Sequence, residues 1–213
     1  MKPLFEHPKV SILIPAYNAE ETIKKTLASI PDRSDIEVLI YDDGSTDDTE
    51  DIAYEGLASC HLNGTVFGDC TNYGVAHAVN QLLDAATGEW VVLLGADDWL
   101  ITDAFSTVVD MLKPTLDLVY FNLEINSGEV WRLTEETKGN CCGSVKFMRR
   151  KFVGDLRCDE TKKAGEDFYF NLGLLRKHPR EAFTDVTAKH YNYPREGSLS
   201  YRQRRGEFAS DEV

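Results

Sequence analysis

The stretch GEWVVLLGADDWL, residues 88–100, determines how the rest of the chain is interpreted. Its apolar run, residues 90–94, is short and follows a glycine, which is typical of a buried strand rather than a helix. The run stops at Gly95, and the carboxylates of Asp97 and Asp98 follow directly. Ligands of open α/β sheets bind beyond such strand ends. Adjacent carboxylates repel unless a cation lies between them, so the pair indicates either a divalent-cation site or a solvated turn that caps the next helix.

The composition is that of one globular domain, because 42% of the 213 residues are hydrophobic and 28% are charged. A formal net charge of -13 argues against nonspecific binding to nucleic acid. We find no apolar run of the roughly 20 residues that span a bilayer and no signal-peptide layout. The five cysteines contain no Cys-x-x-Cys pair, which favours free thiols. We therefore expect a cytoplasmic protein without a transmembrane segment, and peripheral contact with the inner membrane face stays open.

The first hundred residues alternate between strand and helix patterns. Strands are predicted at residues 10–14, 36–41, 65–67 and 90–94, and helices at residues 20–30, 46–57 and 74–86. This order predicts a parallel, doubly wound sheet. Three polar turns, at residues 15–18, 42–46 and 95–98, follow strand ends. In a parallel sheet all three lie along one edge, so they can converge on one ligand.

The second half is less regular. The patterns predict a helix at 102–112, a hairpin from 116–125 and 129–133, a short basic helix at 145–153, a helix from 165 to about 177, and a last strand at 182–193. We expect a single domain over residues 1–205, with a nucleotide-binding half at about 8–100 and an acceptor half at about 101–205. Residues 206–213 read as a flexible acidic tail. The sequence does not predict an oligomeric state.

Taken together, these motifs resemble the inverting GT-A glycosyltransferases of family 2. The resemblance rests on VSILIPAYNAEETIKKTLASI, IEVLIYDDGSTDDT, NYGVAHAVNQLLDAATGEWVVLLGADD, the Gly165-Glu166-Asp167 triplet and YNYPREGSLS, and it covers about residues 8–201. It implies a three-layer α/β fold of the nucleotide-diphospho-sugar transferase type, with a mostly parallel central sheet and an acceptor-side extension. It further implies transfer of a sugar from a nucleoside diphosphate sugar to a hydroxyl group of a glycan or other acceptor, with inversion and with Mn²⁺ or Mg²⁺ as cofactor.

The resemblance also implies roles for individual residues. Asp167 would be the general base and Glu166 would orient it or the acceptor. Asp98 and Asp97 would hold the metal, with His190 as a weaker candidate ligand. Asp42 can accept a hydrogen bond from a uracil N–H, which favours UDP, although an Asx turn explains it equally well. The remaining donor contacts would come from Pro15, Ala16, Tyr17, Asn18, Asp43, Asn72, Gly74, Asn80, Asp97, Arg195 and Ser198.

Two departures and two rival functions remain. The family often has an aspartate where this chain has Gly95, and an arginine where it has Val79. A catalytically degenerate module that binds a nucleotide or a glycan is therefore an alternative. A nucleotidyltransferase would need a glycine-rich phosphate loop bearing Lys or Arg near the first strand, and residues 15–18 supply neither.

Overall fold

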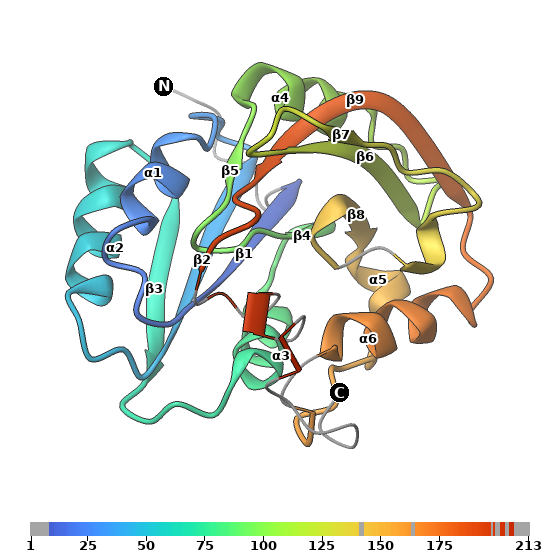
Figure 1. The fold of residues 1–213 in the computed structure, drawn as a ribbon. Coiled ribbons are helices and arrows are strands. Elements are labelled where there is room, and N and C mark those ends of the chain that lie inside the picture. Colours follow the sequence, from blue (N-terminus) through green and yellow to red (C-terminus); the bar gives the residue numbers. More distant parts are fainter. Residues whose placement is uncertain are drawn as a thin grey trace.

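The computed structural model describes residues 9–140, 143–162, 165–196, 198, 201–202 and 205–206, and in them one nine-stranded sheet carries helices on both faces (Figure 1). The strands are β1 (Val10–Ala16), β2 (Ile36–Asp43), β3 (Gly64–Asp69), β4 (Trp90–Leu93), β5 (Trp99–Leu100), β6 (Leu118–Ile125), β7 (Val130–Trp131), β8 (Lys146–Arg149) and β9 (Glu181–Tyr191). The α-helices are α1 (Ile23–Ala28), α2 (Thr49–Ser59), α3 (Val75–Ala85), α4 (Thr102–Met111), α5 (Arg150–Val153) and α6 (Glu166–Leu175). Two short 3₁₀ turns, Lys138–Asn140 and Gly143–Val145, precede β8.

The first half forms the expected parallel sheet. β1 lies between β2 and β4, with Val10 opposite both Ile36 and Trp90, and β3 pairs with the outer edge of β2. β1 and β4 are buried almost throughout, which matches their continuous apolar sequences. The three polar turns therefore share one edge of the sheet, as predicted.

The second half extends the same sheet with mixed pairing. β8 runs antiparallel to β4 and to β6, whereas β9 runs parallel to β6 and then pairs with β5. The predicted helix at 145–153 is therefore wrong in its first part, where β8 fills the space between β4 and β6. Phe147 and Met148 face opposite cores, and strand pairing on both sides outweighs the helical pattern of the sequence.

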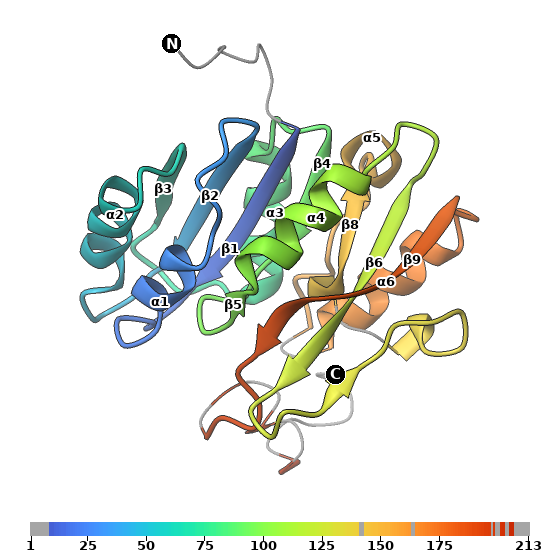
Figure 2. The ribbon, with the colours of Figure 1, turned by 90° about the horizontal axis from the view of Figure 1, so that it is seen from above.

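Two hydrophobic cores cover the two faces of the sheet. One core contains Ile23 and Leu27 of α1, Leu57 of α2, and Phe105 and Val108 of α4. The other contains residues of α3, α5 and α6, among them Leu82, Val153 and Phe170. Figure 2 shows α1 and α4 on one side of the sheet and α3, α5 and α6 on the other. The molecule thus has the predicted three layers. Among the described residues, no helix has the length and apolar character needed to cross a bilayer.

Candidate active site

The turns after β1 and β2 are held together by side-chain to backbone hydrogen bonds. The Asn18 N–H donates to Ser45 Oγ at 2.9 Å, and the Thr46 N–H donates to Asn18 Oδ1 at 2.9 Å. The Glu20 N–H donates to Asp47 Oδ2 at 3.1 Å. These contacts fix residues 18–20 and 45–47 outside regular helix, which explains why α1 and α2 begin three residues later than their sequence patterns predict.

The two aspartates that end β2 have different partners. The Asp42 carboxylate accepts from the Ser45 N–H at 3.3 Å and from the Ser45 hydroxyl, so it is tied to the turn that follows β2. Asp43 accepts from the N–H groups of Tyr73 and Gly74, at 2.9 and 2.7 Å, and so fastens the chain that leads into α3. Asn72 and Gly74 thus lie beside the acidic end of β2. Tyr17 is 50% exposed near the same edge.

Asp98 forms a buried ion pair that sequence reasoning did not find. Its Oδ2 lies 2.6 Å from Lys189 Nζ of β9, and its Oδ1 accepts from the Asn192 N–H at 3.0 Å. Asp98 is 3% exposed and Lys189 is 1% exposed, and Lys189 also donates to Ser144 Oγ. Burial raises the pKa of the Asp98 carboxyl above its ordinary value, and the Lys189 ammonium opposes that shift. A lysine in a strand pattern gives no sequence signal that it is buried, because the pairing spans 91 positions.

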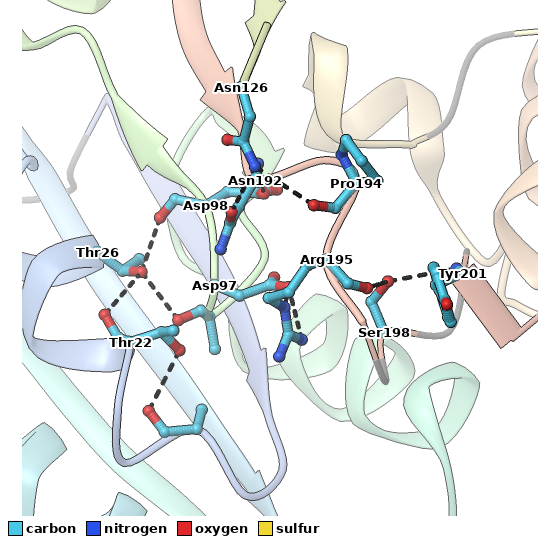
Figure 3. A network of polar contacts seen from close by, with 12 residues as sticks. Thr22, Thr26, Asp97, Asp98, Asn126, Asn192, Pro194, Arg195, Ser198 and Tyr201 are labelled. Atoms are coloured by element: carbon cyan, nitrogen blue, oxygen red, sulfur yellow. Dashed lines mark hydrogen bonds and ion pairs between the residues drawn. The ribbon is translucent and has the colours of Figure 1, made fainter.

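Asp97 is turned toward the open side of the site. Its Oδ2 accepts from Arg195 Nε at 2.9 Å and lies 2.8 Å from the second guanidinium nitrogen (Figure 3). Both side chains are partly exposed. The Ser198 hydroxyl donates to the Arg195 carbonyl at 2.8 Å and so shapes the loop that carries the arginine. The structure therefore brings Asp97, Arg195 and Ser198 together.

Gly95 leaves room for both carboxylates. A Cβ atom at this position would lie 2.9 Å from Asp97 Oδ1 and 3.0 Å from Asp98 Oδ2. The turn is held from the other side by the Thr26 hydroxyl of α1, which is 2.9 Å from the Ala96 carbonyl and 2.7 Å from the Asp98 carbonyl (Figure 3). The absence of a side chain at residue 95 is thus part of how the acidic turn packs.

His190 lies away from the aspartates. It stacks on Trp99 with ring centroids 4.0 Å apart, and its Nδ1 and Nε2 lie 3.0 Å from Glu124 Oε1 and 2.9 Å from Asn126 Oδ1. Neighbouring strand residues point to opposite faces, so His190 and Lys189 are directed apart. Within the described part of the chain no three His, Cys, Asp or Glu side chains form a metal-binding cluster.

A pocket of about 140 Å³ lies between α3, α6 and the end of β4. It is lined by Pro15, Val75, Val79, Leu93, Leu94, Gly95, Asp98, Ser144, Cys158, Glu166, Asp167 and Phe170. The predicted catalytic pair thus shares one pocket with the acidic turn, although about 70 positions separate them in the sequence. Burial, followed by the charge of Asp167, raises the pKa of Glu166 to about 7.

Asn80 supports this pocket from behind. Its amide donates to the Cys158 carbonyl at 3.0 Å and to Glu160 Oε1 at 2.7 Å, and its Oδ1 accepts from the Cys158 N–H at 2.8 Å. All of these partners belong to the chain that leads to Glu166. Asn80 therefore fastens that segment to α3 in this structure, instead of presenting its amide to the pocket.

Comparison with known proteins assigns the chain to a family. The family model described as "Glycosyl transferase family 2" matches residues 11–177, so the chain belongs to that family. It is 27% identical over 182 residues to a Campylobacter jejuni GalNAc(5)-diNAcBac-PP-undecaprenol beta-1,3-glucosyltransferase, a match that covers 79% of this chain and 58% of that protein. It is 34% identical over 161 residues to a Mycobacterium bovis PGL/p-HBAD biosynthesis glycosyltransferase, covering 70% of this chain and 62% of the relative. The chain thus spans about three fifths of the length of these relatives.

Solved structures share the fold. Staphylococcus aureus TarS 1–349 in complex with UDP-GlcNAc superimposes with a TM-score of 0.78 over 89% of this chain and 60% of that chain, at 23% identity. Mannosyltransferase PcManGT from Pyrobaculum calidifontis, in complex with GDP-Man and Mn²⁺, gives a TM-score of 0.73 over 94% of this chain and 61% of that chain, at 22% identity. The expected GT-A fold is confirmed.

Proposed function

We propose that this domain transfers a glycosyl group from a nucleoside diphosphate sugar, with UDP as the nucleotide, to a hydroxyl group of a glycan acceptor. The observation that carries the proposal is the shared pocket, in which the acids at the start of α6 face the acidic turn after β4. The acids of α6 are thereby available for the acceptor proton, and the acidic turn is available for a divalent cation that would bind the leaving diphosphate. The complexes of TarS with UDP-GlcNAc and of PcManGT with GDP-Man support a nucleotide-sugar donor.

The proposed reaction is a single displacement with inversion. Asp167 accepts the proton of the acceptor hydroxyl, the acceptor oxygen bonds to the anomeric carbon, and the bond from that carbon to the diphosphate breaks, so that the nucleoside diphosphate leaves. Glu166, whose pKa lies at about 7, can remain protonated near neutral pH and donate a hydrogen bond to the acceptor. The reaction needs no nucleophile from the protein.

We assign the divalent cation first to Asp97. Mg²⁺ is commonly held by one or two carboxylates together with substrate phosphates, and Asp97 offers a partly exposed carboxylate next to Asp98, which lines the pocket. Asp98, which the sequence put first, already pairs with Lys189 and the Asn192 N–H, so we give it the role of positioning the turn. When bound, the metal would neutralise charge on the leaving diphosphate. Arg195 would then release the Asp97 carboxylate and bind the diphosphate instead.

We also propose an acceptor and a location for the reaction. The name of the Campylobacter jejuni relative describes an acceptor linked to undecaprenol diphosphate. We propose a lipid-linked or other glycan acceptor, met by a cytoplasmic protein at the inner membrane face. The formal net charge of -13 disfavours nonspecific binding to nucleic acid.

Nucleotide titration by calorimetry, with Mn²⁺ present, tests the function. UDP should bind more tightly than GDP or ADP, and Asp42→Ala should abolish that preference. Asp110→Ala removes an exposed carboxylate of α4 that pairs with Arg33, and it serves as the control. Tighter binding of ADP or GDP by the unaltered protein would contradict the UDP assignment. Nucleotide binding without transfer or donor hydrolysis would favour the non-catalytic module.

A further inference from the structure

One wall of the pocket is apolar. Val75 and Val79 are four residues apart on α3, so they present adjacent side chains on one face of the helix. Leu93 of β4 and Phe170 of α6 line the same pocket, and all four belong to, or pack against, one hydrophobic cluster. The wall therefore continues the core of the protein up to the surface of the pocket.

Cys158 also lines this wall, and its thiol behaves as an apolar group. Burial, followed by the negative charge of Glu166, raises the pKa of the Cys158 thiol to about 12, so the thiol stays protonated. A buried protonated cysteine packs as a small hydrophobic side chain. Asn80, on the same helix, uses its amide on residues 158 and 160. Among the described lining residues, hydrogen-bonding side chains lie instead at Asp98, Ser144, Glu166 and Asp167.

A pocket divided in this way would discriminate among sugars by their substituents. A sugar hydroxyl placed against Val75, Val79 and Leu93 would give up its hydrogen bonds to water and gain none, which is unfavourable. A methyl group in the same place would remove apolar surface from water, which is favourable. The other hydroxyls of the sugar can still reach the acidic side of the pocket.

We infer that the donor sugar carries a methyl-bearing substituent that packs on the wall formed by Val75, Val79, Leu93, Cys158 and Phe170. The substituent is either the acetamido group of an N-acetylated sugar or the methyl carbon of a 6-deoxy sugar, and an unmodified hexose is the disfavoured donor. This inference rests on the proposed function, since it specifies the sugar that the proposed transferase carries.

Matched pairs of donors test the inference by calorimetry. UDP-glucose is compared with UDP-N-acetylglucosamine and with UDP-6-deoxyglucose, and GDP-mannose is compared in parallel with GDP-6-deoxymannose. At least one methyl-bearing donor should bind about 10-fold or more tightly than its unmodified partner, as a methyl group in an apolar pocket allows. The tighter of the two UDP donors identifies the source of the methyl group. Equal or tighter binding of the unmodified hexoses overturns the inference.

Val79→Thr provides the matched variant. Threonine keeps the shape of valine but places a hydroxyl on the wall, so the preference for the methyl-bearing donor should fall by about 10-fold while UDP alone binds as before. Val66→Thr is the control, because Val66 is also 4% exposed but lies on β3 outside the pocket. An unchanged preference in Val79→Thr would contradict the inference. If the unaltered protein binds neither UDP nor GDP, the proposed function is wrong, and the inference that rests on it is wrong as well.

Discussion

Asp167 and Glu166 are adjacent acids with different proposed tasks. Asp167→Asn keeps the size of the side chain but cannot accept a proton, so we expect transfer to fall by at least about 10². UDP affinity should stay within a few-fold, because the proposed nucleotide contacts come from the turns after β1, β2 and β4. Initial rates with a radiolabelled donor measure the first effect and calorimetry the second. Asp155→Asn changes an exposed acid before α6 and should leave both unchanged.

The Glu166→Gln variant shows which of the two acids is the general base. If transfer survives in Asp167→Asn but is lost in Glu166→Gln, then Glu166 is the base. If UDP binding is lost together with transfer in Asp167→Asn, the aspartate has a structural or metal-binding role.

Glu166 should also make stability depend on pH. Its ordinary pKa of 4.5 rises to about 7 in the folded protein, so the folded state holds the proton more tightly than the unfolded state. This contribution favours folding below pH 4.5 and is lost as the pH rises through 7. Glu166→Gln cannot titrate and should gain about 1–2 kcal/mol relative to the unaltered protein between pH 5 and pH 8, after allowance for partial exposure. Urea denaturation at pH 5 and pH 8 measures the free energy of unfolding of both proteins. The same difference between Glu166→Gln and the unaltered protein at the two pH values would contradict the prediction.

The Asp98–Lys189 pair should matter more for folding than an exposed ion pair does. Lys189→Met leaves the Asp98 carboxylate buried and unpaired, which should lower the free energy of unfolding by about 3–5 kcal/mol. Adding Asp98→Asn should recover part of that loss, because the uncompensated charge is removed. Lys24→Met changes an exposed lysine of α1 and should alter stability by no more than about 0.5 kcal/mol. A small effect of Lys189→Met would return Asp98 to consideration as a primary metal ligand.

At the scale of elements, α3 connects the two halves of the site. The two residues that precede it are fastened to Asp43, and its middle residue Asn80 is fastened to the segment that precedes α6. We expect Asn80→Ala to lower the free energy of unfolding by about 2–4 kcal/mol, because buried backbone groups of Cys158 lose their partners. Trypsin cleavage after Arg157 and Lys162 should become faster, and transfer should fall more than UDP affinity does.

The control for this element is Gln81→Ala, at the next residue of the same helix. Trypsin should cleave this variant at the same rate as the unaltered protein. Equal losses of UDP affinity and transfer in Asn80→Ala would show that Asn80 contacts the nucleotide, as the resemblance implies.

The elements also show what the sequence can predict. The apolar runs of β1, β2 and β4 are buried from both sides, so their local sequence is enough to place the turns that follow them along one edge. β8 was missed because residues 146–149 become a strand only when β4 and β6 flank them. The partners of the two aspartates were missed for a similar reason. Lys189 reaches Asp98 because β9 pairs with both β6 and β5, and no local pattern encodes that arrangement.

At the scale of the molecule, both halves share one sheet and two cores. The core on the α1 and α4 face joins Ile12 and Val92 of the first half to Phe121, Phe147 and Ala188 of the second. We therefore expect a single cooperative unfolding transition, in which urea curves from tryptophan fluorescence and far-ultraviolet circular dichroism coincide. Two separated midpoints would show that the halves fold as independent domains.

The packing of Gly95 limits which substitutions can follow one another in evolution. An aspartate at residue 95 would bring its Cβ into the space of the Asp97 and Asp98 carboxylates. Asp97 can turn toward solvent, but Asp98 is held by Lys189 and Asn192. An acid at residue 95 is therefore easier to accommodate once the contacts that hold Asp98 to β9 and the chain after it are loosened. We therefore expect Gly95→Asp to be tolerated better when Lys189 is also replaced than in the unaltered protein.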